Sequence, residues 1–340
     1  MHVVVLSIAS LLSFCVPPAP AAPSTLACRY VEAGVPGPVG NVLEVDGTGN
    51  VAIARDGEQI VVSLAKANGW LEEREIECTG GTPTVTTVDQ IAYDAPTDLN
   101  QILIDERDGR LEPGATDEPA GDDEIEVSIQ ISRTGDHRPN VHILGTAGPD
   151  LIAAADLRGE RAGINLNVRD DRSYRDADVI VTRPRRAIVK IDGYGGADRL
   201  LAAGAAGGAG FLGPLSLSPL VLLGGEGEDF LLGGFRGDHL EGEAGDDLIV
   251  GRGGRDFVYA GSGRDEVFAG SGDDWILGER TSEDDAQFDV YAGGRGDDYI
   301  SSWRGGRDEV RCGSGFDEAR VDRFDAWDGH GCDEVRVAKR

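Results

Sequence analysis

Residues 224–277 read GGEGEDFLL, GGFRGDHLE, GEAGDDLIV, GRGGRDFVY, AGSGRDEVF and AGSGDDWIL, six nonapeptides that follow one another without a gap. Every copy has an aspartate at its sixth place and an apolar residue at its eighth. The aspartates are Asp229, Asp238, Asp247, Asp256, Asp265 and Asp274, and the apolar residues are Leu231, Leu240, Ile249, Val258, Val267 and Ile276. A fixed period of this length predicts a solenoid that is built from one short unit per repeat.

The same register continues on both sides of the six copies. After a polar insertion at residues 279–288 it returns at Asp289, Asp298, Asp308 and Asp317, and before the six copies it occurs at Asp150 and Asp198. Of these outlying turns, those at Asp150, Asp198, Asp308 and Asp317 are equally compatible with plain turns that bind nothing.

Glycine and aspartate in this pattern favour a metal site. Glycine allows the backbone conformations that turn peptide carbonyls toward an ion, and aspartate is a short, hard oxygen ligand of the kind that calcium prefers. The candidate glycines are Gly224, Gly227, Gly233, Gly242 and Gly251. Neighbouring coils lie about 4.8 Å apart, so carboxylates on one edge would share an ion. Without one, each pair would repel by on the order of 3 kcal/mol.

These nonapeptides resemble the repeats-in-toxin consensus G-G-x-G-x-D-x-U-x, where U is a large apolar residue. The resemblance covers Gly193 to Arg320 well and reaches loosely back to Gly145. It implies a parallel β-roll that binds several calcium ions, with a turn of six residues and a strand of three in each repeat. Two repeats would complete one coil. The aspartates would then alternate between two edges, with Asp229, Asp247 and Asp265 on one and Asp238, Asp256 and Asp274 on the other.

The core of such a roll is thin, and some turns depart from the pattern. One buried apolar side chain in nine residues returns less free energy than ordering the backbone costs, so we predict that the roll is largely unfolded without calcium. Arg236 replaces a fourth-place glycine, and Leu220 stands where an aspartate would precede the strand at 221–223, so no ion is expected there. Ala260 and Ala269 replace first-place glycines, which is a mild change.

The rest of the chain also predicts β structure, which makes the whole an all-β protein: a parallel β-roll with an irregular β-solenoid before it and capped ends. Short strands are expected at residues 101–104, 125–131, 141–144, 179–182 and 188–191, separated by turn residues. The predicted division is a signal peptide at 1–21, a β-rich N-terminal cap at 22–80, an irregular β-solenoid at 81–192, the calcium-binding roll at 193–320 and a C-terminal cap at 321–340.

The first residues predict export. An uncharged run from Val3 to Val16 leads to Ala19-Pro20-Ala21, which matches a signal-peptidase site, so we expect a secreted, extracellular protein. Cys15 would leave with the signal. The four cysteines that remain allow three disulfide connectivities. The local pairs, Cys28 with Cys78 and Cys312 with Cys332, are favoured because so many residues separate the two pairs.

The excess of acidic residues limits the kinds of molecule that the protein can bind. The chain has 61 acidic residues against 32 lysines and arginines, so a polyanion such as nucleic acid would be repelled and cations attracted. The longest uncharged stretch after the signal, 200–225, contains many glycines together with Pro214 and Pro219, which prevent a membrane-spanning helix. No membrane span is therefore expected.

No catalytic motif stands out. Neither H-E-x-x-H nor G-x-S-x-G occurs, and His137 and His142 are interpreted as surface residues. The function predicted is binding of several calcium ions without catalysis. One alternative is a calcium-dependent adhesin or matrix protein that contacts cells or polysaccharide through Trp275, Tyr299 and Trp303. Another is an enzyme with its active site in residues 82–190. Ice binding is disfavoured because the nonapeptides contain almost no threonine.

Overall fold

The structure of the chain is a computed structural model that describes residues 26–32, 41–47, 50–65, 71–88, 90–95, 101–108, 126–131, 138–157, 161–166, 179–183, 187–202, 211–214, 220–278, 287–302, 306–327 and 331–338. The predicted signal peptide, His137, Trp303 and most of the insertion at 279–288 lie outside these residues. Within them every regular element is a β-strand, so the all-β prediction is confirmed.

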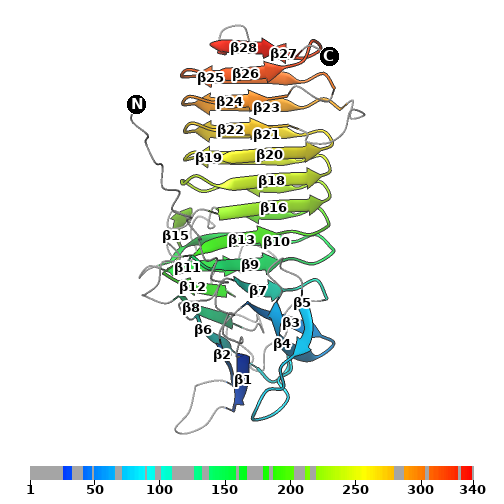
Figure 1. The fold of residues 1–340 in the computed structure, drawn as a ribbon, viewed down its shortest axis with the longest axis vertical. Coiled ribbons are helices and arrows are strands. Elements are labelled where there is room, and N and C mark those ends of the chain that lie inside the picture. Colours follow the sequence, from blue (N-terminus) through cyan, green and yellow to red (C-terminus); the bar gives the residue numbers. More distant parts are fainter. Residues whose placement is uncertain are drawn as a thin grey trace, which may run out of the picture.

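The described strands form two long sheets, one of 15 strands and one of 13 (Figure 1). In spatial order the first sheet contains β1 (Leu26–Val31), β2 (Val42–Gly47), β6 (Gln90–Ala95), β8 (Glu126–Ile131), β12 (Val179–Thr182), β11 (Arg161–Asn165), β10 (Leu151–Leu157), β14 (Arg199–Leu201), β17 (Phe230–Leu232), β19 (Leu248–Gly253), β21 (Glu266–Ser271), β23 (Val290–Arg295), β25 (Glu309–Ser314) and β27 (Ala326–Trp327), with β15 (Phe211–Pro214) beside β10. The second contains β28 (Glu334–Val337), β26 (Glu318–Val321), β24 (Tyr299–Ser301), β22 (Trp275–Leu277), β20 (Phe257–Ser262), β18 (His239–Ala244), β16 (Leu220–Glu226), β13 (Ile188–Asp192), β9 (Asn140–Leu144), β7 (Gln101–Asp105), β3 (Val51–Asp56), β4 (Gln59–Ala65) and β5 (Leu71–Glu75).

From β16 onward, successive strands of the chain alternate between the two sheets, and each of them pairs in parallel with its neighbours in its sheet. The register places eighth-place residues beside each other one coil apart, as with Leu231 and Ile249 in the first sheet and Leu240 and Val258 in the second. Two nonapeptides therefore make one coil, and the coils stack as a regular ladder in the upper half of Figure 1. The predicted parallel β-roll is confirmed.

The eighth-place side chains fill the space between the sheets. Leu231, Ile249, Val258 and Ile276 are completely buried, as are Ile300, Val310 and Ala319 of the later coils, and Tyr291 is 1% exposed. The residues on either side of them point outward, which gives strands such as β20 their alternating burial. Each sheet thus contributes one column of large apolar side chains to the core, as the period-two pattern of each short strand requires.

The segment before the roll belongs to the same two sheets. All five strands expected there are present, as β7, β8, β9, β12 and β13, and one continuous cluster of buried apolar residues runs from Cys28 to Val321. The antiparallel pairs β10–β11 and β11–β12 were not expected from the sequence, and they make this part irregular.

Strands β27 and β28 extend the roll. β27 pairs in parallel with β25, and β28 pairs in parallel with β26, so each sheet gains one more strand at this end (Figure 1). In the part of the chain that the structure describes, no helix has the length and apolar character needed to cross a membrane.

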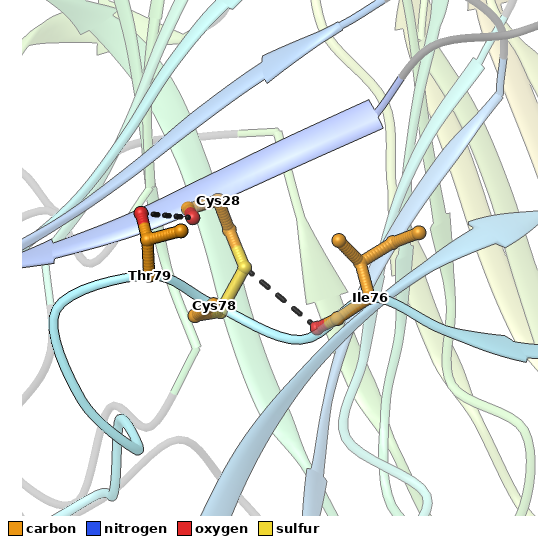
Figure 2. The surroundings of a disulfide bond; sticks show 4 residues. All are labelled: Cys28, Ile76, Cys78 and Thr79. Carbon is orange, nitrogen blue, oxygen red and sulfur yellow. Dashed lines mark hydrogen bonds between the residues drawn. A yellow bond between two sulfur atoms is a disulfide. The ribbon is translucent and has the colours of Figure 1, made fainter.

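Both favoured disulfides are present, which confirms the local pairing. Cys28 is bonded to Cys78, where the hydroxyl and the amide of Thr79 both donate to the carbonyl oxygen of Cys28, at 3.3 and 3.0 Å (Figure 2). Cys312 is bonded to Cys332 at the other end of the molecule.

Candidate metal sites

Glycines at the second and fourth places shape each turn of the roll. Gly225 and Gly227 have φ angles of 113° and 140°, which side chains with a Cβ rarely adopt. Space is short as well: a Cβ on Gly227 would lie 1.6 Å from the carbonyl oxygen of Gly196 in the preceding coil. The fourth-place glycine therefore lets the turns stack closely, whereas Glu243 and Arg252 at the second place of two later repeats adopt positive φ angles without being glycine.

The sixth-place aspartates of the first edge form a ladder. The backbone N–H of each aspartate donates to Oδ1 of the aspartate one coil further on, as from Asp229 to Asp247 at 2.8 Å. The series runs through Asp150, Asp198, Asp229, Asp247, Asp265, Asp289, Asp308 and Asp325.

A second ladder follows the other edge. It begins with the N–H of Leu220, which donates to Oδ1 of Asp238, and continues through Asp238, Asp256, Asp274, Asp298, Asp317 and Asp333. Since Leu220 has no carboxylate, the ladder has no earlier acidic member at that point. All twelve aspartates singled out from the sequence thus lie in the two ladders. Asp150, Asp198 and Asp229 follow one another on the first edge, and from Asp229 onward the aspartates alternate between the edges.

The other carboxylate oxygen sets apart a subset of these aspartates. In seven of them Oδ2 is buried, and no hydrogen-bond donor among the described residues reaches it: Asp198, Asp229, Asp247, Asp256, Asp274, Asp298 and Asp308. A buried carboxylate oxygen without a donor costs several kilocalories per mole unless something else compensates the charge. A cation beside these seven oxygens would compensate the charge.

The first-place glycines lie directly against these oxygens. A Cβ on Gly242 would stand 2.3 Å from Oδ2 of Asp247 and 2.2 Å from the carbonyl oxygen of Ala260. Gly224 and Gly251 are enclosed in the same way by Asp229 and Asp256. Each such turn therefore brings a carboxylate and a backbone carbonyl of the next coil close together.

The carboxylates hold their protons unusually tightly. Burial, reinforced by neighbouring carboxylates, raises the pKa of Asp247 to about 8, and Asp198, Asp256 and Asp308 reach about the same value. Burial likewise raises the pKa of Asp298 to about 7. In the folded roll the ionised form is thus disfavoured at neutral pH unless a positive charge lies nearby.

The donor set fits calcium better than zinc. Among the described residues, no group of three or more His, Cys, Asp or Glu side chains converges on one point. An ion would therefore take one or two carboxylates and several backbone carbonyls, an all-oxygen set that calcium accepts with its six to eight ligands.

Three of the other aspartates predicted from the sequence have protein donors at Oδ2. Oδ2 of Asp150 accepts the N–H and hydroxyl of Thr146, at 2.7 and 3.0 Å. Oδ2 of Asp238 accepts the N–H of Gly234 at 2.7 Å, in the repeat where Arg236 replaces glycine. Oδ2 of Asp289 accepts the hydroxyl of Tyr291. Turns of this kind need no cation to compensate the oxygen.

Two ladder members at the C-terminal end were missed from the sequence. Asp325 and Asp333 follow Asp317 at intervals of eight rather than nine residues, so a strict nine-residue search passes over them. The signal was present nonetheless, because each is followed two residues later by an apolar residue, Trp327 or Val335.

A further set of hydrogen bonds, formed by exposed aspartates, runs beside both ladders. Fifth-place aspartates accept backbone N–H groups from the coil on their other side: Oδ1 of Asp246 accepts that of Arg264, and Oδ1 of Asp273 accepts that of Asp297. Asp297 in turn accepts the N–H of Phe316 at 2.8 Å. Adjacent aspartates in one turn therefore have different tasks, the fifth binding the next coil and the sixth the previous one.

The interpretation of His142 as a surface residue is wrong, because its side chain is only 8% exposed. It lies on β9 with Nε2 3.5 Å from Oδ2 of Asp192 and Nδ1 3.4 Å from the amide of Gln101. Burial alone would raise the pKa of Asp192, but the hydrogen bond to His142 and the charge of Lys190 outweigh it and lower that pKa.

Comparison with known proteins agrees with this geometry. The family described as RTX calcium-binding nonapeptide repeat (4 copies) matches residues 223–258 and 250–280, the stretch that holds the most regular turns. No curated protein matches the chain. The repeats at residues 223–280 therefore belong to the RTX family of calcium-binding nonapeptide repeats, which forms β-rolls of this kind.

Proposed function

We propose that this chain is a secreted protein that binds several calcium ions between the coils along both edges of its roll, and that the ions hold the coils together rather than take part in catalysis. The observation that carries the proposal is the set of seven buried Oδ2 atoms without a hydrogen-bond donor among the described residues. Calcium, when bound, supplies the positive charge that these stacked carboxylates lack.

The protein groups that would hold the ions are the sixth-place aspartates, with Asp229, Asp247, Asp256, Asp274 and Asp298 in the regular repeats and Asp198, Asp265, Asp308 and Asp317 in the same ladders. First-place glycines leave room for the carboxylates, and second- and fourth-place glycines turn the backbone. Because the ladders are continuous, binding at one turn orders the next, and folding of the roll is coupled to the ions.

Export is part of the same proposal. Two disulfides are the bonds of an oxidising compartment, and an N-terminal signal peptide is consistent with them. Calcium modules that work outside cells bind at roughly 0.1 to 1 mM, so the roll would stay unfolded until it leaves the cell.

The test is far-UV circular dichroism of residues 22–340 titrated with calcium from chelator to 10 mM, with magnesium as the control. A cooperative gain of β signal with calcium alone is the expected result. An unchanged spectrum, together with no heat of binding by calorimetry, would show that the aspartates only form turns.

A calcium-dependent adhesin is the second candidate, and one observation favours it. Outward side chains of the second sheet form a column of aromatic rings, with centroids 5.3 Å apart for His239 and Phe257, 6.2 Å for Phe257 and Trp275, and 5.2 Å for Trp275 and Tyr299. Trp275 is 51% exposed. Aromatic rings of this kind stack on sugars. Binding on a glycan array that chelator abolishes, and that Trp275→Ala weakens, would support this candidate; binding that ignores chelator would oppose it.

A further inference from the structure

The turn at Asp289 differs from the others in what surrounds its carboxylate. Oδ1 accepts the N–H of Asp265 at 2.8 Å, as the ladder requires, but Oδ2 accepts the hydroxyl of Tyr291 at 2.8 Å. Tyr291 occupies the eighth place, where the neighbouring coils have Val267 and Val310, and its ring points into the core with 1% exposure. Both oxygens of this carboxylate thus have protein donors.

Gly278, which has no side chain, leaves room for this hydroxyl in the core. A Cβ on Gly278 would lie 2.6 Å from the hydroxyl oxygen of Tyr291, so a side chain there would displace it. Gly278 is buried and donates its own N–H to the carbonyl of Ser301. Tyrosine at the eighth place and glycine at 278 are therefore complementary.

The sequence before Asp289 also lacks what a calcium turn requires. The five preceding residues, 284–288, read DDAQF and contain no glycine, whereas the five before Asp298 read GGRGD. Without glycines at the first, second and fourth places, the backbone has no easy route to the left-handed conformations found at Gly294 and Gly296. Two independent features, a hydroxyl donor and a turn without glycine, coincide at one aspartate.

We propose that the hydroxyl of Tyr291 takes, at Asp289, the place that calcium takes at the other turns, so that this coil of the roll is closed without a metal ion. The inference rests on the proposed function and refines it, since Asp289 was among the candidate ligands. The hydroxyl donates a proton to Oδ2, which a Val or Leu at the same place could not do. In the coil that follows the insertion at 279–288, a side chain of the protein then compensates the carboxylate in place of an ion.

The experiment counts bound calcium on the full mature chain, by isothermal calorimetry and by atomic absorption after equilibrium dialysis, for wild type, Asp289→Asn and Asp247→Asn. Asparagine at 289 keeps an oxygen for the N–H of Asp265 and offers an amide N–H to the oxygen of Tyr291, so the count stays that of wild type. Asp247→Asn, on the same edge, lowers the count by at least one ion. An equal loss in both variants would overturn the inference. Absence of bound calcium in wild type would instead overturn the proposed function.

A second variant tests the hydroxyl itself. Tyr291→Phe keeps the ring in the core but removes the hydrogen bond from the hydroxyl to Oδ2 of Asp289. The thermal midpoint in 5 mM calcium is expected to fall by at least about 2 °C with the same ion count as wild type. An unchanged midpoint, or a count lower by one ion, would show that the hydroxyl does not serve in place of a metal.

Discussion

The backbone N–H of Asp229 donates a 2.8 Å hydrogen bond to Oδ1 of Asp247, one coil further along the same edge. The same contact repeats along both edges, so each carboxylate is fixed by one oxygen and presents the other to the interior of the turn. An isolated aspartate on a surface turn would rotate away into water. Here the ladder holds it buried, which is why charge compensation becomes a condition for stacking the coils.

Asp297 and Asp298, the fifth- and sixth-place aspartates of one turn, allow a direct test of which aspartates bind calcium. Asp298→Asn should remove one calcium ion and raise the calcium concentration at the folding midpoint, because its buried Oδ2 has no donor among the described residues. Asp297→Asn should leave both unchanged, since asparagine still accepts the N–H of Phe316. Calcium titrations followed by circular dichroism compare the two. Equal effects would mean that burial of the sixth-place carboxylate is irrelevant to the ions.

Gly242→Ala should disrupt a turn. The added Cβ would lie 2.3 Å from Oδ2 of Asp247 and 2.2 Å from the carbonyl oxygen of Ala260, so the coils must separate. We expect a loss of about 1 to 3 kcal/mol in the free energy of unfolding measured in saturating calcium. Gly195→Ala is the control, because the nearest atom to its Cβ would be the carbonyl oxygen of Glu226 at 3.9 Å. If both variants unfold at the same denaturant concentration, close packing at Gly242 is not needed.

Because each strand of the roll contributes only one large apolar side chain to the core, each such side chain matters for stability. Ile249→Ala should lower the free energy of unfolding by about 2 to 5 kcal/mol, because Ile249 is completely buried. Leu248→Ala, at the adjacent outward position that is 37% exposed, should cost much less. Urea unfolding in calcium measures both. A larger loss for Leu248→Ala would indicate that the outer face of the first sheet is buried against something.

Without calcium, acid should stabilise the roll. Burial raises the pKa of Asp247, Asp256 and Asp308 in the folded state to about 8, from 3.8. Their contribution to stability is complete below pH 4 and is lost as the pH rises toward 8. In chelator, β signal should therefore increase from pH 8.5 to pH 5. Protons and calcium compete for the carboxylates of the folded roll, so the calcium concentration at half-maximal binding should rise as the pH falls over the same interval. A β signal in chelator that falls on acidification would contradict the burial of these carboxylates.

Removing the C-terminal disulfide should loosen that end of the roll. Replacing Cys312 and Cys332 by alanine opens a loop with a sequence separation of 20 and should cost about 3 kcal/mol. Hydrogen exchange read by mass spectrometry should show faster exchange in β25 and β28 than in β19. Uniformly faster exchange through the whole roll would mean instead that the bond stabilises all coils together.

Much of the roll follows from the sequence because a single rule governs it. A period of nine with aspartate sixth and an apolar residue eighth determines the buried face of Val258, the alternation of edges and the pairing of coils. The rule fails where spacing or direction changes. Asp325 and Asp333 come after eight residues, and β10 to β12 turn back as antiparallel strands, so no fixed period marks them.

Other features depend on contacts between residues that are distant in the sequence or that a local pattern does not describe. His142 is buried because β9 packs beside β13. This packing also places Nε2 of His142 next to the carboxylate of Asp192. The bond from Tyr291 to Asp289 is local, yet the sequence suggests only a large apolar residue at the eighth place. Which carboxylate oxygens keep a donor is settled by three-dimensional geometry, and this divides twelve similar aspartates into different classes.

The two disulfides lie at opposite ends of the stacked coils, Cys28–Cys78 before the first and Cys312–Cys332 across the last. A stack of units that touch only their neighbours normally unravels from its ends, where each unit has one neighbour instead of two. With a disulfide at each end, the terminal coils become more stable than the coils between them. When calcium is scarce, the coils in the middle of the roll would unfold before the two ends. The ends would stay folded, and refolding of the middle would then begin from coils that are already formed.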